Sequence, residues 1–475
     1  MKTKYTCLRR RLGGKNIVLP DGFTRRDLLC SVAGAFVAKS ASLGLDSPVP
    51  KPRANPLAPP VGPHRQVSGV MIGNHEARYD LHGVLLPWTS WGNAIDREMN
   101  WYLKCPMEHG YPRFICMTFM DGNFQPIERR KDFIPSMQNG MGIISYLKYY
   151  RSRGARNPKW LQVARYMGDY LVRDSLTPNT GKWPRFTRST GWRERFPQPP
   201  DCGCQDDHPY ETEPDKGGIA GYALMLLYEE TKDDRYLNQA LQNGRDLAAN
   251  MGPGTKDSSP WPFRVDYRTG AGRGPVSANM SFILRLFDKL LEHGHGEFRE
   301  PRQRLWTWIN DYQIPSLAEG GALWVQFFED HQELDNRNSW SPNNLARYLL
   351  EKKDALDPDW QPHSKALIEF VVRNFTSIRH GVPVCGEQTY DMNPWGGALS
   401  TYGAVLSMYS SVTGLQEFKG LAWQALNYGL YATKDNGCPR DSSLKAGCGG
   451  WQEDAHTDKV HNYLDAMAAF PEWAS

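Results

Sequence analysis

The chain has 475 residues, with 56 Lys and Arg against 52 Asp and Glu, and a formal net charge of only +4. This balance, without a Lys/Arg run, argues against a nucleic-acid partner. The length allows one large domain or about two to three ordinary ones. After the N-terminal region no apolar run is long enough to span a bilayer.

The N-terminal segment is predicted to be an export signal and not part of the fold. Eight basic residues precede Asp27, and Arg25-Arg26 leads into a mildly apolar run from Leu28 to Leu45. The pattern over residues 1–45 resembles a bacterial twin-arginine signal, which implies a periplasmic or secreted protein. A basic tail is the alternative. We expect a proline-rich linker over residues 46–64 and the folded domain over residues 65–475.

From there on, apolar residues recur at helical spacing in paired stretches. One pair carries its stripes from Ile219 to Leu227 and from Leu237 to Ala248, joined by a short polar turn, which predicts a helical hairpin. First helices of such pairs are expected to start near residues 140, 218, 279, 343, 399 and 459. Second helices are expected near residues 159, 234, 302, 363 and 418. Ser341-Pro342-Asn343 and Asn393-Pro394-Trp395 resemble helix caps.

A twelfth helix is predicted from Trp91 to Lys104. If it closes against the last helix, the array becomes a ring of six hairpins. Connections within pairs are short, for example Thr231 to Asp234, whereas connections between pairs are long, for example Thr177 to Lys216. Because long loops in compact domains are usually functional, we expect the site at the end of the ring where the first helices begin.

This arrangement resembles the six-hairpin glycosidase-like group of (α/α)6 toroid proteins over about residues 70–475. The resemblance implies an all-α fold, an (α/α)6 toroid of six helical hairpins with long loops on one face. Glycoside hydrolases, polysaccharide lyases and sugar epimerases share that architecture. The resemblance is architectural, with no family-defining catalytic motif, so it assigns no catalytic residue.

The long loops repeat one kind of composition, aromatic rings beside acids and amides. Such rings stack on the apolar faces of sugars, while carboxylates bind hydroxyls. The alternative is that the Trp side chains only hold the loops onto the helices. The predicted sugar-binding aromatic residues are Trp183, Tyr210, Trp261, Tyr390, Trp395 and Trp451.

Glycoside hydrolysis requires an acid and a second carboxylate. The candidate catalytic residues are Glu211, Asp207, Glu387, Asp391, Glu453 and His456. Glu211, Glu213 and Asp215 precede a helix start; we expect Asp215 to cap that helix and Glu211 to do the chemistry. Glu211→Gln is therefore expected to abolish turnover.

Four arginines crowd the first long loop, Arg185, Arg188, Arg193 and Arg195, which suggests a substrate with uronic acids. A solvated basic loop is the alternative. With a uronate, a lyase or epimerase using Tyr or His as base becomes credible, and His208 and His461 join the expected binding residues.

The sequence thus favours an exported carbohydrate-active enzyme, a glycoside hydrolase acting on an oligo- or polysaccharide. A polysaccharide lyase or sugar epimerase is the first alternative, and a non-catalytic helical-repeat binding protein is the second. The unequal connections argue against the binder. We expect no cofactor, no metal, no nucleic-acid partner and no membrane span in the mature protein.

Overall fold

The computed structural model describes residues 65–116, 120–125, 134–189, 210–328, 333–394, 396–439 and 452–475, with only the backbone for 65–68 and 452–455. All of them lie in one compact unit, Ala54–Ser475. The predicted export signal and linker, residues 1–64, lie outside the described residues.

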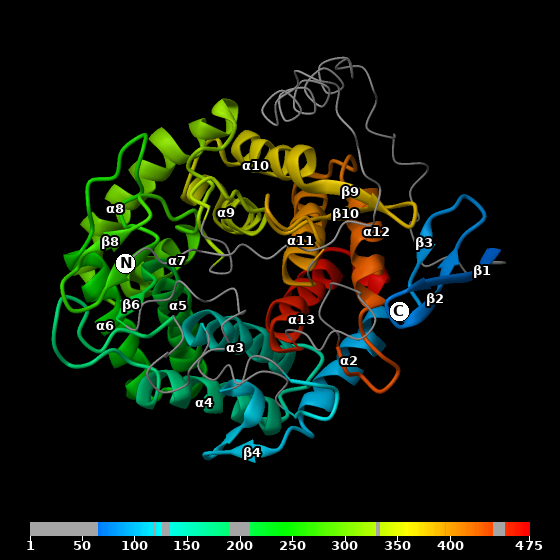
Figure 1. The fold of residues 1–475 in the computed structure, drawn as a ribbon, viewed down its shortest axis with the longest axis horizontal. Helices are drawn as coiled ribbons and strands as arrows, with labels where there is room; N and C mark the ends of the chain where they lie inside the picture. Colours follow the sequence, from blue (N-terminus) through cyan, green and yellow to red (C-terminus); the bar gives the residue numbers. More distant parts are fainter. Residues whose placement is uncertain are drawn as a thin grey trace, which may run out of the picture. The chain divides into compact units, whose positions relative to one another are not determined.

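Two layers of helices build this unit (Figure 1). The inner helices are α3 (Pro135–Arg151), α5 (Pro214–Thr231), α7 (Ser281–Glu292), α9 (Trp340–Lys352), α11 (Gly396–Thr413) and α13 (Gln452–Ala469). The outer helices are α2 (Trp91–Tyr102), α4 (Pro158–Arg173), α6 (Asp234–Ala249), α8 (Arg299–Trp308), α10 (Trp360–Phe375) and α12 (Lys419–Leu430). The outer helices α4 and α6 bury one stripe each, whereas α3 and α5 are buried nearly all round.

The inner helices form a closed ring, as predicted. Each one contacts the next, from α3 through α5, α7, α9 and α11 to α13, and α13 contacts α3 again. At this last junction the Ser145 hydroxyl of α3 donates to the backbone oxygen of Thr457 in α13. The predicted twelfth helix, α2, lies against α13, where Tyr102 stacks on His456 at 3.7 Å. The all-α (α/α)6 toroid is therefore confirmed.

Glycines allow neighbouring inner helices to approach closely. A Cβ on Gly140 of α3 would lie 2.8 Å from a methyl group of Ile219 in α5. A Cβ on Gly218 of α5 would lie 3.1 Å from the backbone nitrogen of Ile283 in α7. Since real Cβ contacts are longer, both sites require glycine.

The long connections between pairs meet at one end of the ring. Strand β6 (Glu211–Thr212) of the first long loop pairs with β7 (Arg264–Asp266) of the second, which pairs with β8 (Gly272–Arg273). The backbone of Ala278 donates to Gln326 in the third loop, and Asn338 forms a bridge with Gln388 in the fourth. The predicted loop-rich end is thus a connected layer.

Smaller sheets lie at the edges of the ring. Strands β1 (Arg65–Ile72), β2 (His75–Tyr79) and β3 (Leu85–Leu86) form an antiparallel sheet beside α12, where Trp88 Nε1 donates to the backbone oxygen of Leu430. Two hairpins pair β4 (Met107–Glu108) with β5 (Tyr111–Pro112) and β9 (Thr376–Arg379) with β10 (Val382–Cys385).

One predicted helix cap is wrong. Helix α9 begins at Trp340, before the predicted cap residue Ser341, and the side-chain oxygen of Asn338 accepts the hydrogen bond from the Ser341 backbone. The Ser339 hydroxyl instead donates to Gly386 and Glu387 of the neighbouring loop. Tertiary contacts thus decide where this helix starts.

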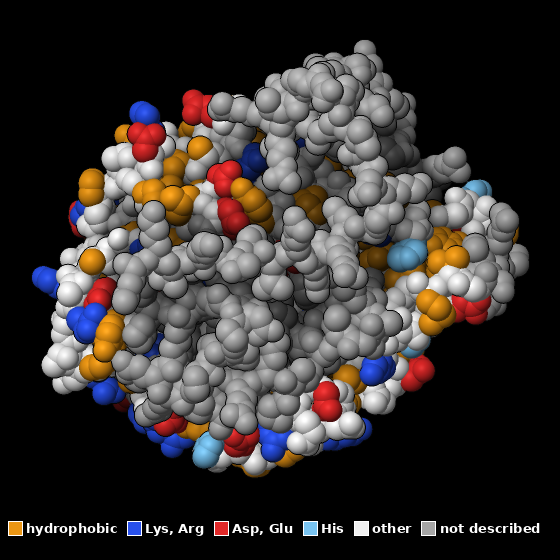
Figure 2. All heavy atoms as spheres, in the orientation of Figure 1, with side chains coloured by type: hydrophobic (Ala, Val, Ile, Leu, Met, Phe, Trp, Pro, Cys, Tyr) orange, Lys and Arg blue, Asp and Glu red, His pale blue; other side chains and the backbone are white. Residues whose placement is uncertain are grey.

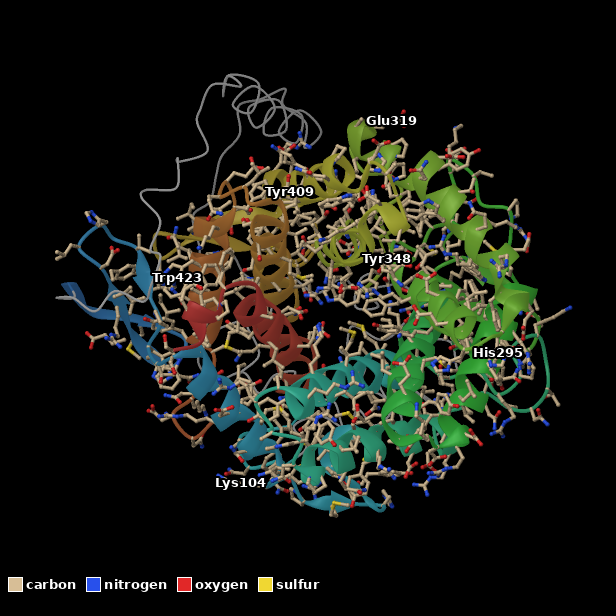
Figure 3. The ribbon with its side chains drawn as sticks, turned by 180° about the vertical axis from the view of Figure 1, so that it is seen from behind. Lys104, His295, Glu319, Tyr348, Tyr409 and Trp423 are labelled. Atoms are coloured by element: carbon tan, nitrogen blue, oxygen red, sulfur yellow. The ribbon has the colours of Figure 1, made fainter. Side chains whose placement is uncertain are left out.

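Seen from behind, the ring shows the inner side of its helices (Figure 3). Tyr348 of α9 lies nearer the axis than Lys104, His295 and Glu319, which lie on the periphery. Within the described part of the chain, every helix is too short or too polar to cross a membrane.

Candidate active site

Buried polar side chains gather where the inner helices begin. Some of their atoms accept or donate no hydrogen bond within the described structure: Asn139 Oδ1, Glu213 Oε2, Asp215 Oδ1, Asn279 Nδ2, Ser341 Oγ and both amide atoms of Asn343. They come from the starts of α3, α5, α7 and α9. Because a buried polar atom without a partner costs about 1–3 kcal/mol, so many at one end of the ring indicate a binding site for a polar ligand.

Two carboxylates and two cations form the charged centre of this end. Lys216 Nζ lies 3.3 Å from Asp215 Oδ2 and 3.6 Å from Glu213 Oε2, and all three side chains are 0% exposed. Arg264 of β7 donates from Nε to Glu213 Oε1 at 2.9 Å. The pairing of the first two long loops through β6 and β7 places Arg264 there.

Asp215 is the member of this cluster whose pKa is shifted toward neutral pH. Burial raises its pKa to about 6, and the neighbouring charge of Glu213 adds to the rise, while Lys216 opposes it. A carboxyl group that titrates near neutral pH can hold a proton for transfer. The sequence analysis had assigned Asp215 to a helix cap.

An aromatic layer extends from the charged centre across the ring. Lys216 Nζ lies 3.9 Å from the centre of the Phe327 ring, and the Phe327 backbone oxygen accepts a hydrogen bond from Lys216. Phe327 stacks on Trp340 at 4.5 Å, and Trp340 stacks on Phe282 at 5.6 Å. Trp340 Nε1 donates to Asp458 Oδ2 of α13 at 3.0 Å. Asp458 is the carboxylate that this layer connects to the Asp215 cluster.

Glu211, the preferred catalytic residue of the sequence analysis, lies close by but is tied to a cation. Both of its oxygens accept hydrogen bonds from Arg273, at 3.0 and 2.7 Å. This pair joins β6 to β8 and anchors the small sheet. The contacts favour a structural function for Glu211.

The two described tryptophans predicted as sugar platforms are buried, which corrects that prediction. Trp183 is 1% exposed and packs edge-on against Phe186 at 4.9 Å. Trp261 is 0% exposed and donates from Nε1 to the backbone oxygen of Leu247. Neither ring has a face for a sugar, so both hold their loops on the helices.

The arginines and the tyrosine of the first loop that were predicted to bind substrate lie in different places. Arg185 is exposed and its backbone oxygen accepts from Gln239 of the outer helix α6. Arg188 is buried, and its backbone oxygen accepts from Ser136 at the start of α3, next to the site. Tyr210 is partly buried under the guanidinium of Arg268, at 3.3 Å.

The fourth loop lies at the same end, beside α9. Glu387 is half-buried, its side chain accepts from Gln388 at 2.9 Å, and its backbone oxygen accepts from Ser339. Asp391 accepts from the backbone and side chain of Asn393, which makes it a turn residue. Tyr390 is 46% exposed and donates to Asp335.

The two histidines of α13 are buried in different networks. His456 contacts Tyr146 through Nε2 at 3.0 Å and Glu98 through Nδ1 at 3.4 Å, and burial lowers its pKa. Lys459 donates to Glu98 at 2.7 Å. His461 contacts the Ser145 hydroxyl through Nδ1 at 3.1 Å. His456 thus has both ring nitrogens engaged, and His461 lies deeper along the ring.

The remaining candidates lie outside the described residues: Asp207, Arg193, Arg195, His208, Trp395 and Trp451. Glu453 belongs to the first turn of α13, but its side chain is not described. The sequence analysis missed Lys216 and Asp458. Both follow a helix start within a few residues, a signal that could have drawn attention to them. Over the described ranges no three His, Cys, Asp or Glu side chains gather as a metal site would require.

Around the loop-rich end the described surface mixes charges. Figure 2 shows Lys and Arg side chains interspersed with Asp and Glu around its edge. The charges that distinguish the site are therefore the buried ones of α5 and β7.

Comparison with known proteins identifies the fold. No family model matches the sequence, and no curated protein matches it. Among solved structures, cellobiose 2-epimerase from Spirochaeta thermophila superposes with a TM-score of 0.58 at 14% identity, covering 80% of this chain and 95% of that chain.

Two further structures represent other reactions. A family 76 glycoside hydrolase from a bovine Bacteroides thetaiotaomicron strain gives a TM-score of 0.55 at 12% identity, covering 83% of each chain. A polysaccharide lyase gives 0.50 at 11% identity, covering 83% of this chain and 55% of that chain. The chain therefore has the (α/α)6 fold found in carbohydrate epimerases, hydrolases and lyases.

Proposed function

We propose that the protein is a carbohydrate-active enzyme, specifically a glycoside hydrolase acting on an oligo- or polysaccharide. The observation that carries the proposal is the convergence of partnerless buried polar atoms around Asp215, whose pKa is raised to about 6. Sugar hydroxyls both donate and accept, so they would satisfy amide and carboxylate atoms together. The three structural relatives are named for carbohydrate substrates, which supports the same substrate class.

In this proposal Asp215 is the general acid that protonates the leaving glycosidic oxygen. Asp458 is the second carboxylate, because the Phe327–Trp340 layer connects it to the Asp215 cluster from the facing helix α13. Asp215 is fully buried, so the proposal requires that the substrate gains access to it.

The cations near the start of α5 support a substrate that contains uronic acids. Arg264 and Lys216 belong to the charged centre, and Arg188 lies at the start of α3. A carboxylate on the sugar would compete with Glu213 and Asp215 for Lys216 and Arg264. The twin-arginine pattern of residues 25–45 supports the further proposal that the enzyme is exported.

Asp215→Asn tests the assignment. A panel of neutral and acidic polysaccharides is incubated with wild-type protein, and new reducing ends are measured. We expect the variant to lose at least about 100-fold in kcat, the usual contribution of a general acid, with an unchanged circular dichroism spectrum.

Asp246→Asn is the matched control. Asp246 lies in the outer helix α6, and burial raises its pKa to about 7, but it faces Gln242 and not the ring. We expect normal turnover from this control. Equal losses in both variants, or full activity of Asp215→Asn, would contradict the assignment.

A sugar epimerase is the second candidate, favoured by the contact between Tyr146, His456 and Glu98, which can relay a proton.

Measuring reducing ends, ultraviolet absorbance and deuterium incorporation in parallel separates the hydrolase, lyase and epimerase reactions. A lyase produces a conjugated double bond that absorbs in the ultraviolet, and an epimerase incorporates solvent deuterium without chain cleavage. Deuterium incorporation without new reducing ends would show that the protein is an epimerase and contradict the hydrolase proposal.

A further inference from the structure

A second site lies inside the ring, further along the inner helices than Asp215. A cavity of about 140 Å³ is lined by side chains of five inner helices. On α3 it is lined by Met141, Ile144, Leu147, Lys148 and Arg151; on the other helices by Tyr222, Leu226, Phe282, Arg285, Arg347, Glu351 and His461. Lys148 and Arg151 belong to the last turn of α3 and are about one-third exposed, so the cavity reaches the surface there.

The aromatic layer separates this cavity from the candidate active site. Phe282 lines the cavity and stacks on Trp340, which in turn stacks on Phe327 beside Lys216. Asp215 and Lys216 are at the start of α5, whereas Tyr222 and Leu226 lie two to three turns further along that helix.

The cavity wall holds two buried guanidinium groups with incomplete pairing. Arg285 is 7% exposed, contacts Glu351 at 2.5 Å and interacts with the Tyr222 hydroxyl, while its Nε and Nη2 atoms make no hydrogen bond of good geometry. Arg347 is 4% exposed, its Nε has no partner, and its nearest carboxylate, on Asp465, is 3.8 Å away. Arg347 also donates to Asn462.

Each cation around the cavity has a carboxylate nearby. Lys148 and Arg347 share Asp465, Arg285 pairs with Glu351, and Arg151 pairs with Glu230. Asp458 also acts electrostatically on Arg347. His461 also lines the cavity, and its Nε2 has no hydrogen-bond partner. The guanidinium and imidazole nitrogens that make no hydrogen bond call for a ligand with acceptor atoms, and a carboxylate supplies two acceptor oxygens.

The remaining wall is apolar, which defines the ligand further. Ile144, Leu147 and Leu226 contribute hydrocarbon surface to the same cavity. A cavity of about 150 Å³ is enough for a benzene ring, so this one has room for a small ring or branched chain. We propose that the cavity binds a small organic carboxylate, with its carboxylate on Arg285 and Arg347 and its apolar body against Ile144, Leu147 and Leu226.

Binding is measured by calorimetry on the full-length protein, independently of any turnover, so failure of the hydrolase proposal leaves this test intact. Benzoate is the probe, benzamide its neutral analogue, and inorganic phosphate the anion without an apolar body. We expect benzoate to bind, and benzamide and phosphate to bind at least about tenfold more weakly. Equal binding of benzamide would overturn the role of the arginines, and equal binding of phosphate would overturn the ligand class.

Two variants locate the site. Arg347→Gln removes the guanidinium, and Leu226→Trp fills the cavity while leaving every charge in place. We expect each to weaken benzoate binding at least about tenfold. Arg302→Gln is the control, because Arg302 pairs with Asp288 and does not line the cavity. Undiminished binding in Leu226→Trp, checked for a native circular dichroism spectrum, would refute the proposed location.

Discussion

Asp215 and Glu211 lie four residues apart but in opposite electrostatic settings. Glu211 is held by two hydrogen bonds to Arg273, a residue whose side chain is 39% exposed. Asp215 is fully buried, and the nearby Glu213 carboxylate makes its ionisation more costly. Burial and like charge are the two effects that hold a proton on a carboxyl group at neutral pH. These surroundings therefore favour Asp215 over Glu211 as the acid of the proposed site.

The pH dependence of turnover follows from that setting. With Asp215 as the general acid, kcat/KM falls as the pH rises above about 6, because the proton is then lost. Glu213→Gln removes a charge that raises the pKa of Asp215, so the alkaline limb of the profile should move to lower pH. Glu211→Gln should leave the limb in place. An alkaline limb that stays in place in Glu213→Gln, or that moves in Glu211→Gln, would contradict this assignment.

Residue types in the loops predicted the end of the ring where the candidate site lies, but not the residues that form its charged centre. Acids before the start of α5 were recognised, yet the charged neighbours of Glu211 and Asp215 decide between them, and sequence spacing does not report those neighbours. Trp183 and Trp261 were ambiguous for the same reason: a loop tryptophan can bind a sugar or anchor the loop. Asp458 becomes a candidate only through its contact with Trp340, more than a hundred residues away.

At the scale of single elements, the inner helices depend on close contacts between neighbours. Gly218 of α5 faces Ile283 of α7, and a Cβ there would lie 2.6 Å from a side-chain carbon and 3.1 Å from the backbone nitrogen. The side-chain carbon can move, but the backbone cannot do so without shifting α7. This contact brings the starts of α5 and α7 together, next to Asp215.

Gly218→Ala should therefore destabilise the protein. Overpacking costs about 1–3 kcal/mol, partly offset by the gain of roughly 1 kcal/mol in helix propensity. Gly296→Ala is the control, because a Cβ on Gly296 meets no atom within 4 Å. Urea unfolding of both variants measures the difference. If Gly218→Ala were as stable as the control, the inner helices would not be packed as tightly as described.

Helix positions were predictable because apolar spacing is a local property. Outer helices α4 and α6 start at Pro158 and Asp234, next to the predicted positions, and each has a side-chain cap from the preceding Asn or Asp. Helix α9 starts at Trp340, near the predicted position, but its cap was assigned wrongly because the start depends on Asn338 and on contacts of Ser339 with another loop. Such contacts join residues far apart in the chain, which a spacing pattern cannot reveal.

At the scale of the whole molecule, α2 joins the two ends of the folded chain. This helix precedes all the others described, yet it packs between α12 and α13 at the other end of the sequence. Trp91 stacks on Trp423 at 5.3 Å and contacts Trp473 and Tyr463 edge-on. Its Nε1 donates to Asn427 Oδ1 at 2.8 Å. One aromatic cluster thus joins the two ends of the helical array.

Trp91→Ala should weaken this junction and lower the free energy of unfolding by about 3–5 kcal/mol, through the cavity it leaves, with a further cost from the buried Asn427 oxygen. Trp360→Ala is the control, because Trp360 is only partly buried at the start of α10. Since α2 also carries Glu98 and Tyr102, which contact His456, amide exchange in α13 should accelerate in Trp91→Ala and not in the control. Unchanged exchange in α13 would show that the last inner helix is held without α2, and the ring would then owe its closure to the contact between α13 and α3.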